Sequence, residues 1–251
     1  MKAAVSFIAA CLIAHAETGR PGTPHLANIR QLTSGGQNAE AYWSPDGQRL
    51  IFQSTRQPYE CDQIFIMNAD GSNAHLVSTG KGRTTCGYFL RDGKHIVYAS
   101  THEAGDACPA PPDRSKGYVW GIFPGYDIYL ATDTGKILRK LTTAPGYDAE
   151  ATVNWKTGRI VYTSLASGDL DLWTMRADGS HKTRLTTAVG YDGGAVFSRD
   201  GRKLVWRANY PSTAEAMDRY KTLLAQNLTA PMKMELVVAD ANGKHARSIP
   251  A

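Results

Sequence analysis

The chain has 251 residues, of which 42% are hydrophobic and 20% are charged, and its formal net charge is +5. This length is enough to bury a large core, and these fractions exclude an intrinsically disordered chain and a coiled coil. The positive charges are scattered, with no block of lysines or arginines, so the sequence does not favour a nucleic-acid partner.

The first residues, MKAAVSFIAACLIAHA, are typical of a secretory signal peptide cleaved after Ala16. They contain one lysine, an apolar run and an Ala-His-Ala cleavage pattern. We therefore expect an exported protein, periplasmic or secreted, in which residues 1–16 are the signal peptide and residues 17–27 a linker. The alternatives are a buried first strand or helix, and lipoprotein processing at Cys11. No later apolar run approaches the roughly 20 residues of a membrane span.

Three cysteines follow the predicted signal peptide: Cys61, Cys86 and Cys108. An oxidising compartment would allow one disulfide among them, and three pairings are possible. We favour Cys61 with Cys86, because both fall near the starts of strands in consecutive repeats. None of the three belongs to a Cys-x-x-Cys pair, so a disulfide is favoured over a zinc site, and we expect neither a metal nor a cofactor.

Tight turns closed by glycine recur in two series. One follows an aromatic or apolar strand, as in WSPDG and FSRDG, and comprises Gly47, Gly93, Gly158 and Gly201. The other, as in NADG and RADG, comprises Gly71, Gly135, Gly179 and Gly243. Asp-Gly between alternating strands is a strong hairpin signal. The distance from the second turn of one repeat to the first turn of the next is nearly constant. The distance between the two turns within a repeat is longer in the second and fourth repeats. Both insertions therefore lie between the second and third strands of their repeats.

Two hairpins per repeat imply four short antiparallel strands, the pattern of a β-propeller blade. The second strands (RLIFQST, KHIVYAS, RIVYTSL, KLVWRAN) and third strands (DQIFIMN, YDIYLAT, LDLWTMR, MELVVAD) are rich in β-branched and aromatic residues. We predict an all-β propeller of four-stranded antiparallel blades, with four blades at about 38–78, 84–143, 148–187 and 191–250. A β-sandwich is the alternative.

One helix is expected, in the insertion of the fourth repeat. Ser212 precedes TAEAMDRYKTLLAQN, and Glu215 three positions on completes a capping box. The apolar residues Met217, Tyr220, Leu223 and Leu224 fall on one face. The helix either plugs the rim of the propeller or takes part in binding.

The motif SPDGxxLIFxSxR, followed by D-x-I-[FY]-x-M-N-A-D-G-S, resembles the propeller repeat of the TolB family, periplasmic proteins of the bacterial Tol-Pal envelope system. The resemblance covers residues 28–250 in four copies, and it implies a TolB-like propeller domain over residues 28–251. Three features depart from the family. We expect the family's N-terminal α/β domain to be absent, the second repeat carries the insert THEAGDACPAPPDRSKGYVWGIFPG, and the family's propeller has six blades where four repeats are counted here.

In TolB-like rings an N-terminal strand completes the last blade, and NIRQLT at residues 28–33 resembles such an outer strand. The fourth repeat nevertheless ends with its own strand, HARSIP. We therefore expect an incomplete six-bladed propeller, an open arc whose exposed edges favour self-association. A closed four-bladed ring with an extra strand is the alternative.

Strand direction places the Asp-Gly turns on one face and both insertions on the other, beside the segments that open the innermost strands. Innermost strands line a propeller's channel, so charged residues should gather at its mouth. This candidate site comprises Glu40, Arg56, Arg83, His102, Asp148, Glu150, Asp192 and Arg207. Alternatively, the carboxylates cap turns and pair with arginines. The insertion aromatics, which cover the channel or form a recognition patch, are Tyr118, Trp120, Phe123 and Tyr126.

The sequence contains no G-x-S-x-G elbow, H-E-x-x-H, phosphate-binding loop or dinucleotide motif, so we predict a protein without catalytic activity. The favoured function is an exported scaffold in the cell envelope that binds a protein or peptide through the insertion-bearing face. One alternative is a propeller that belongs to, or gates, a peptidase or another hydrolase. The other is a carbohydrate-binding or lyase propeller that uses the channel carboxylates.

Overall fold

The computed structural model describes residues 26–115, 117–231 and 233–249. The predicted signal peptide and most of the predicted linker lie outside these ranges. The chain divides into two units at Gly35. In the first unit, residues 26–34 form no helix or strand. The strand predicted over residues 28–33 is therefore wrong. A strand needs a neighbouring strand for its backbone hydrogen bonds. None of the described strands pairs with residues 26–34.

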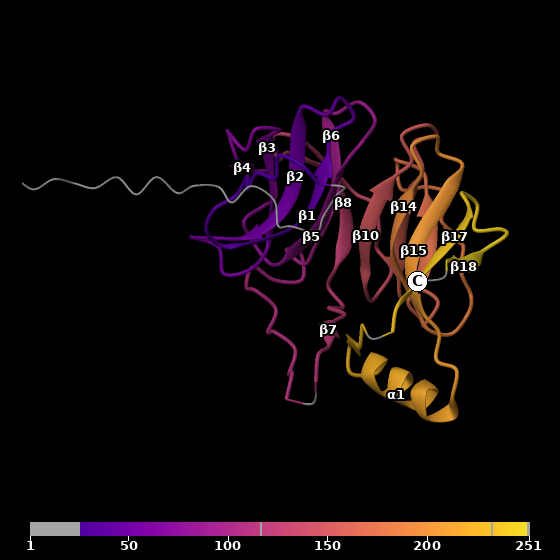
Figure 1. Cartoon of the computed structure of the whole chain (residues 1–251). Helices are drawn as coiled ribbons and strands as arrows, with labels where there is room; N and C mark the ends of the chain where they lie inside the picture. Colours follow the sequence, from indigo (N-terminus) through magenta and orange to yellow (C-terminus); the bar gives the residue numbers. More distant parts are fainter. Residues whose placement is uncertain (1–25, 116, 232, 250–251) are drawn as a thin grey trace, which may run out of the picture. The chain divides into compact units, whose positions relative to one another are not determined.

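The second unit contains four antiparallel sheets of four strands, each built in chain order (Figure 1). Blade 1 has β1 (Gln37–Trp43), β2 (Arg49–Thr55), β3 (Gln63–Asn68) and β4 (His75–Leu76). Blade 2 has β5 (Thr84–Phe89), β6 (His95–Ser100), β8 (Asp127–Thr132) and β9 (Ile137–Lys140). Blade 3 has β10 (Asp148–Val153), β11 (Ile160–Ser164), β12 (Asp171–Met175) and β13 (Thr183–Arg184). Blade 4 has β14 (Tyr191–Phe197), β15 (Lys203–Asn209), β17 (Glu235–Asp240) and β18 (Arg247–Ile249).

The prediction of an all-β propeller with four such blades is confirmed. Each blade packs on the next through apolar faces: Ile51 and Ile64 lie against Phe89 of blade 2, and Val161 against Trp206 of blade 4. Among the described residues, the strands of blades 1 and 4 do not pack on each other as neighbouring blades do. The four blades therefore form an arc with two ends.

The two insertions meet in the structure, which agrees with their predicted position on one face. The blade 2 insertion contributes β7 (Trp120–Gly121), and the blade 4 insertion contributes β16 (Leu228–Thr229), which pairs with β7 in an antiparallel two-stranded sheet. The expected helix is α1 (Ala214–Leu224), in which Tyr220 is the buried apolar residue. Its N-cap is Thr213, whose side chain accepts a hydrogen bond from the amide of Ala216, and not Ser212 as predicted.

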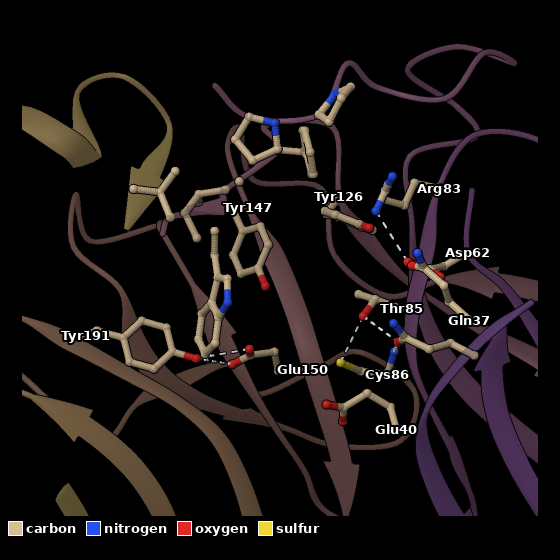
Figure 2. A pocket seen from close by; sticks show the side chains of 18 of the residues that line it. Gln37, Glu40, Asp62, Arg83, Thr85, Cys86, Tyr126, Tyr147, Glu150 and Tyr191 are labelled. Carbon is tan, nitrogen blue, oxygen red and sulfur yellow. Dashed lines mark hydrogen bonds and ion pairs between the residues drawn. The ribbon is translucent and has the colours of Figure 1, made fainter. Parts of the chain in front are cut away.

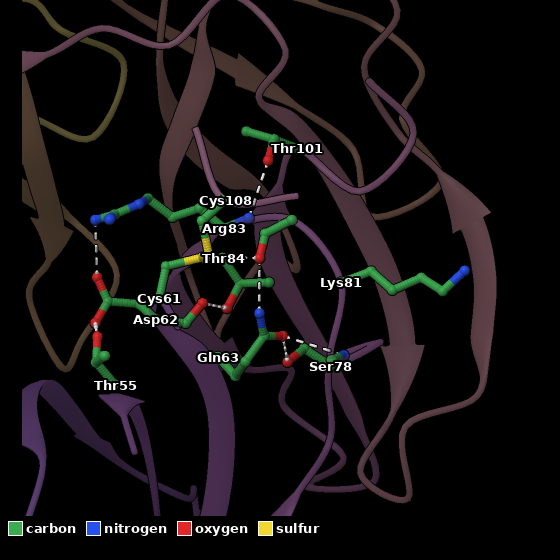
Figure 3. The surroundings of a disulfide bond; sticks show 12 residues. Thr55, Cys61, Asp62, Gln63, Ser78, Lys81, Arg83, Thr84, Thr101 and Cys108 are labelled. Atoms are coloured by element: carbon green, nitrogen blue, oxygen red, sulfur yellow. Dashed lines mark hydrogen bonds and ion pairs between the residues drawn. A yellow bond between two sulfur atoms is a disulfide. The ribbon is translucent and has the colours of Figure 1, made fainter. Parts of the chain in front are cut away.

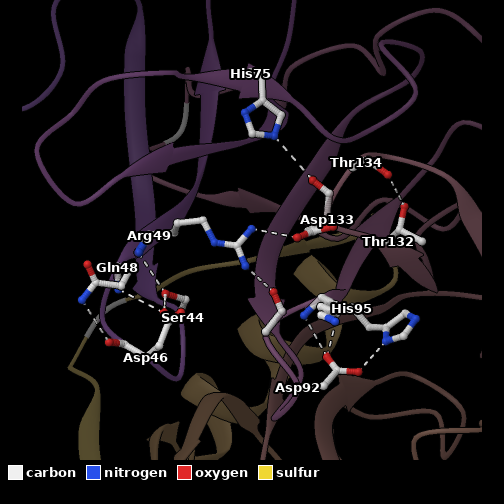
Figure 4. A network of polar contacts seen from close by, with 12 residues as sticks. Ser44, Asp46, Gln48, Arg49, His75, Asp92, His95, Thr132, Asp133 and Thr134 are labelled. Atoms are coloured by element: carbon white, nitrogen blue, oxygen red, sulfur yellow. Dashed lines mark hydrogen bonds and ion pairs between the residues drawn. The ribbon is translucent and has the colours of Figure 1, made fainter.

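Side-chain hydrogen bonds hold the Asp-Gly turns, and the arginine that follows the first turn also joins two blades. In the first turn, Ser44 donates a hydrogen bond to Asp46 (2.6 Å). Arg49 follows this turn, and its guanidinium pairs with Asp133 of blade 2 at 2.7 Å (Figure 4). The same guanidinium lies over the Phe89 ring. The charge and the apolar stem of Arg49 thus both connect blade 1 to blade 2.

In the described part of the chain, a disulfide joins Cys61 to Cys108 (Figure 3). Cys86 is a free thiol. The predicted preference for Cys61 with Cys86 is wrong for a geometric reason. Cys86 lies on β5, the innermost strand of its blade, whereas Cys61 precedes β3, the third strand of blade 1. The blade 2 insertion returns past Cys61 and brings Cys108 to it. The bond therefore fastens this insertion to blade 1.

Peptide mapping without reduction is expected to find Cys61 linked to Cys108 and Cys86 free for alkylation. Replacing Cys108 with serine removes a link that closes a 47-residue separation, and chain-entropy arguments give a loss of about 4 kcal/mol in the free energy of unfolding. Urea denaturation would measure this loss. Cys86→Ser is the matched control, because it keeps the linked peptide. A linked peptide that contains Cys86 would contradict the assignment.

Candidate functional site

One backbone device recurs at the centre of every blade. The innermost strand shifts register against the second strand, between Ala39 and Tyr42 in blade 1 and at the equivalent places in the other blades. In each blade the residue at this bulge has a positive φ of 51–61°, and these residues are Glu40, Cys86, Glu150 and Gly194. A left-handed residue breaks the strand's alternation and re-aims its side chain. The four repeats thus present four equivalent positions to the central space.

Three of these positions, Glu40, Cys86 and Glu150, line a pocket of about 580 Å³ on the insertion-bearing face (Figure 2). Its walls come from innermost strands of all four blades and from the segment around β7. The charged residues that line it include Glu40, Asp62, Arg83, Arg114, Glu150 and Arg207. Aromatic rings line it as well: Trp120, Phe123, Tyr126, Tyr147 and Tyr191. The pocket combines charges of both signs with a large aromatic surface.

Glu150 is the most constrained charge in the pocket. It accepts hydrogen bonds from Thr163 (2.9 Å), from the Tyr191 hydroxyl (3.0 Å) and from the amide of Gly194 (2.7 Å). Its side chain is 12% exposed, and Arg207 approaches it at 3.5 Å. Burial, together with the charge of Glu150, raises the pKa of Tyr191 well above its usual value, so this hydroxyl stays a donor. The interpretation that carboxylates pair with neighbouring groups describes Glu150 well.

Glu40 occupies the equivalent position in blade 1 with fewer contacts. It accepts a hydrogen bond from the Tyr42 hydroxyl (2.6 Å). Cys86 holds the equivalent position in blade 2. Burial, together with the charges of Glu40 and Glu150, raises the pKa of the Cys86 thiol well above its usual value. A protonated thiol is a poor nucleophile and a poor metal ligand. Glu40 is thus the carboxylate of this set with most capacity for a further partner.

The blade 2 insertion forms one wall of the pocket. Trp120 packs edge-on against Tyr191 (6.0 Å between ring centroids), and the Arg207 guanidinium lies over the Trp120 ring. Phe123 is covered in the same way by Arg83, which also pairs with Asp62 at 3.3 Å. Both guanidiniums hold their carboxylate partners at long distances, and the Arg83 Nε is buried without a hydrogen-bond partner in the described part of the chain. These arginines retain donors for a ligand.

The structure brings together only part of the predicted set. Glu40, Arg83, Glu150, Arg207, Trp120, Phe123 and Tyr126 line the pocket; Arg56, His102, Asp148, Asp192 and Tyr118 do not. Arg56 lies over the rings of Phe52 and Phe65 in blade 1. The His102 ring packs against Tyr129 at 4.4 Å. Tyr118 is 56% exposed and accepts a hydrogen bond from the Trp120 indole.

Asp148 and Asp192 are buried inside the blades, two residues before the bulge. Asp192 accepts hydrogen bonds from the Trp206 indole and the Tyr210 hydroxyl, both at 2.6 Å. Because the residue at the bulge has a positive φ, the side chains of Asp148 and Glu150 point in different directions. Glu150 faces the pocket, whereas Asp148 faces the blade. Tyr147, Tyr191 and Cys86 also line the pocket, and the sequence did not predict these positions. Alignment of the four repeats on Glu40 and Glu150 was the available signal for Cys86.

No group of three or more His, Cys, Asp or Glu side chains in ranges 26–115, 117–231 and 233–249 is arranged to hold a metal ion. Within the same ranges, no helix has the length and hydrophobicity needed to cross a bilayer.

The sheets and their order define the chain as a β-propeller of the TolB type in fold. The "putative TolB" of Agrobacterium tumefaciens superimposes with a TM-score of 0.62 and 18% identity, over 83% of this chain and 63% of that one. TolB from Acinetobacter baumannii superimposes with a TM-score of 0.62 and 15% identity, over 86% of this chain and 44% of that one. An oligogalacturonate lyase in complex with manganese superimposes with a TM-score of 0.55 and 14% identity, over 88% of this chain and 56% of that one. The chain therefore spans less than two thirds of each of these proteins. No protein-family model matches the sequence.

The buried aspartates are expected to give the fold a specific pH dependence. Burial raises the pKa of Asp192 to about 6, against 3.8 for the free group, although hydrogen bonds from Tyr210, Trp206 and Thr186 favour the charged form. The folded state therefore holds a proton that the unfolded state has lost between these values, and stability falls as the pH rises from about 4 to 6. Asp148 behaves in the same way, with a pKa of about 6.

Urea denaturation of the wild type and of Asp192→Asn at pH 4, 5, 6 and 7 tests this dependence. The amide cannot ionise and still accepts both hydrogen bonds at its oxygen. We expect the stability of the wild type, relative to the variant, to fall by on the order of 2 kcal/mol from pH 4 to 7. Asp200→Asn, on an exposed turn, is the control: hydrogen bonds from Ser198 and Arg202 lower the pKa of the Asp200 carboxyl, so its contribution to stability changes below pH 4 and is expected to stay nearly constant from pH 4 to 7. Parallel curves for wild type and Asp192→Asn would contradict the assignment.

Proposed function

We propose that this chain is an exported, non-catalytic propeller that binds a protein or peptide partner of the cell envelope through the pocket beneath β7. The observation that supports it most is the composition of the pocket. Trp120 and Phe123 lie under Arg207 and Arg83 on the insertion-bearing face, and tryptophan, tyrosine and arginine are the residues that dominate protein interfaces.

The size of the pocket agrees with a peptide segment or a few side chains of a protein. Its volume of about 580 Å³ is that of a site for a small ligand. Its lining combines carboxylates, guanidiniums and aromatic rings, which suits the mixed donors and acceptors of a peptide backbone. The TolB-type fold and the leader-like N-terminus support a periplasmic location, since TolB family proteins are periplasmic.

A carbohydrate ligand is the second candidate, and one observation favours it. Three arginines, Arg83, Arg114 and Arg207, line the pocket, and arginine binds carboxylates in two-point geometry. An acidic oligosaccharide would use these groups. The neighbouring carboxylates Glu40 and Glu150 oppose a polyanion, so we place this candidate after a peptide.

Selection from a displayed peptide library on the immobilised protein, followed by titration of the selected peptides by fluorescence anisotropy, tests the proposal. Trp120→Ala and Glu40→Gln are the pocket variants. Truncation of a central aromatic anchor is expected to weaken binding by about 10-fold or more. Trp43→Ala is the matched control: Trp43 is 51% exposed and lines the opposite mouth of the central space, beside the Asp-Gly turns. This control is expected to stay within about two-fold of the wild type.

Equal affinities of the wild type and both pocket variants would refute the proposal, as would a larger loss for Trp43→Ala. Titration with an acidic oligosaccharide in the same assay separates the second candidate. A carbohydrate that binds the wild type and is lost in Arg207→Gln, with no peptide selected, would replace a peptide by a glycan as the ligand.

A further inference from the structure

Two tyrosine hydroxyls in the pocket have no partner in the protein. Tyr126 and Tyr147 both line the pocket, and these residues are only 4% and 8% exposed. Their rings pack edge-on, with 5.7 Å between the centroids, but neither hydroxyl forms a hydrogen bond within the described part of the chain. Buried polar groups in proteins are nearly always hydrogen-bonded. These two hydroxyls are therefore available to a ligand.

Two of the pocket's carboxylates already have a cation beside them. Asp62 pairs with Arg83 at 3.3 Å, and Glu150 pairs with Arg207 at 3.5 Å. Both guanidiniums also lie over aromatic rings of the blade 2 insertion. The positive charges of these two pairs are thus held on the side of the pocket that the insertion forms.

Glu40 is the carboxylate of the pocket that lacks such a pair. Its hydrogen bond comes from the Tyr42 hydroxyl, and within residues 26–115, 117–231 and 233–249 no lysine or arginine forms an ion pair with it. Burial, together with the charge of Glu40, raises the pKa of Tyr42 well above its usual value, so this partner is neutral. The third arginine of the lining, Arg114, lies over the ring of Tyr118 in the insertion. No ion pair therefore balances the negative charge of Glu40.

The groups that lack a partner face one part of the pocket. Figure 2 shows the carboxylates of Glu40 and Glu150 beside Cys86, and the Tyr147 hydroxyl directed towards the same space. Burial and the charges of both carboxylates raise the pKa of the Cys86 thiol, and burial and the charge of Glu150 raise that of Tyr147. The four groups thus lie within electrostatic reach of one another. We call Glu40, Cys86, Tyr147 and Glu150 the acidic side of the pocket.

The acidic side of the pocket favours a cation over the other groups that a ligand could place there. A carboxylate or a phosphate would be repelled by Glu40 and Glu150. An apolar group would exclude water and leave the Glu40 charge and the Tyr147 hydroxyl unpaired, which is unfavourable in a desolvated site. A positive group with several N–H donors satisfies both, and the faces of the surrounding aromatic rings attract cations as well.

We propose that the bound partner inserts a lysine or arginine side chain into the acidic side of the pocket. Glu40 balances its charge, the hydroxyl oxygen of Tyr147 accepts a hydrogen bond from it, and the aromatic rings cover its methylene groups. The pocket volume of about 580 Å³ holds such a side chain together with the backbone beside it. This inference rests on the proposed function, which it narrows to partners with an accessible basic residue.

Ligand-observed NMR titration with three small probes tests the inference without a selected peptide. The probes are the Nα-acetyl methylamides of lysine, arginine and norleucine, and norleucine has the apolar chain of lysine without the ammonium group. We expect the better basic probe to bind the wild type about 10-fold more tightly than norleucine, because it forms hydrogen bonds between charged groups. Comparison of the lysine and arginine probes identifies which basic group the pocket takes.

Two pocket variants and one control locate the effect. Glu40→Gln keeps an acceptor oxygen for Tyr42 and is expected to reduce the preference for the basic probe to about two-fold or less. Tyr147→Phe keeps the ring and is expected to weaken binding of the basic probe by about three-fold. Glu60→Gln is the matched control, because Glu60 is an exposed glutamate of the same blade outside the pocket lining. It is expected to stay within about two-fold of the wild type.

Urea midpoints verify that each variant is folded. Three results would each overturn the inference: failure of both basic probes to bind at millimolar concentration, equal binding of norleucine and the better basic probe, or equal effects of Glu40→Gln and Glu60→Gln.

The inference and the proposed function can fail separately. Selected peptides that tolerate norleucine at every basic position would retain a peptide as the ligand and remove the basic side chain. A preference for the basic probe that depends on Glu40, with no peptide selected, would retain the cation site and remove the peptide.

Discussion

A four-stranded blade has two apolar faces and can bury neither of them alone, and this constraint governs the whole molecule. Each interface between neighbouring blades joins aliphatic side chains of one sheet to aliphatic and aromatic side chains of the next, as Val161 and Leu172 meet Trp206. The burial of such faces supplies most of the driving force for folding. The same stacking places the innermost strands of the four blades around the pocket at one end of the central space.

The position of the pocket depends on a detail of the innermost strands. A regular strand would point alternate residues to the same side, so Asp148 and Glu150 would share an environment. The left-handed residue at each bulge prevents this. It sends Asp148 and Asp192 into the blades, where burial raises the pKa of each to about 6, and turns Glu40 and Glu150 to the central space. One feature of the backbone thus divides four neighbouring carboxylates into two structural and two pocket residues.

The sequence alone predicted the four blades, the two insertions on one face and most of the pocket's charged and aromatic residues. These features depend on local turn chemistry and on the alternation of apolar and polar residues in the strands. Both signals occur in each of the four repeats. The errors have physical causes. The pairing of Cys61 with Cys108 depends on the path of a long insertion, which spacing does not encode. The positions of Asp192 and His102 depend on bulges and on ring packing, and no turn motif marks either of them.

The insertions connect blades that are not neighbours in the arc. The blade 2 insertion is tied to blade 1 by the disulfide and to the blade 4 insertion by the pairing of β7 with β16, while Trp120 packs on Tyr191 and Arg207 of blade 4. Blade 3 lies between the blades so joined. The same segment therefore braces the arc at one mouth and forms a wall of the pocket. Because both roles use Trp120, a ligand that contacts this residue also stabilises the brace, and binding and stability are coupled through one loop.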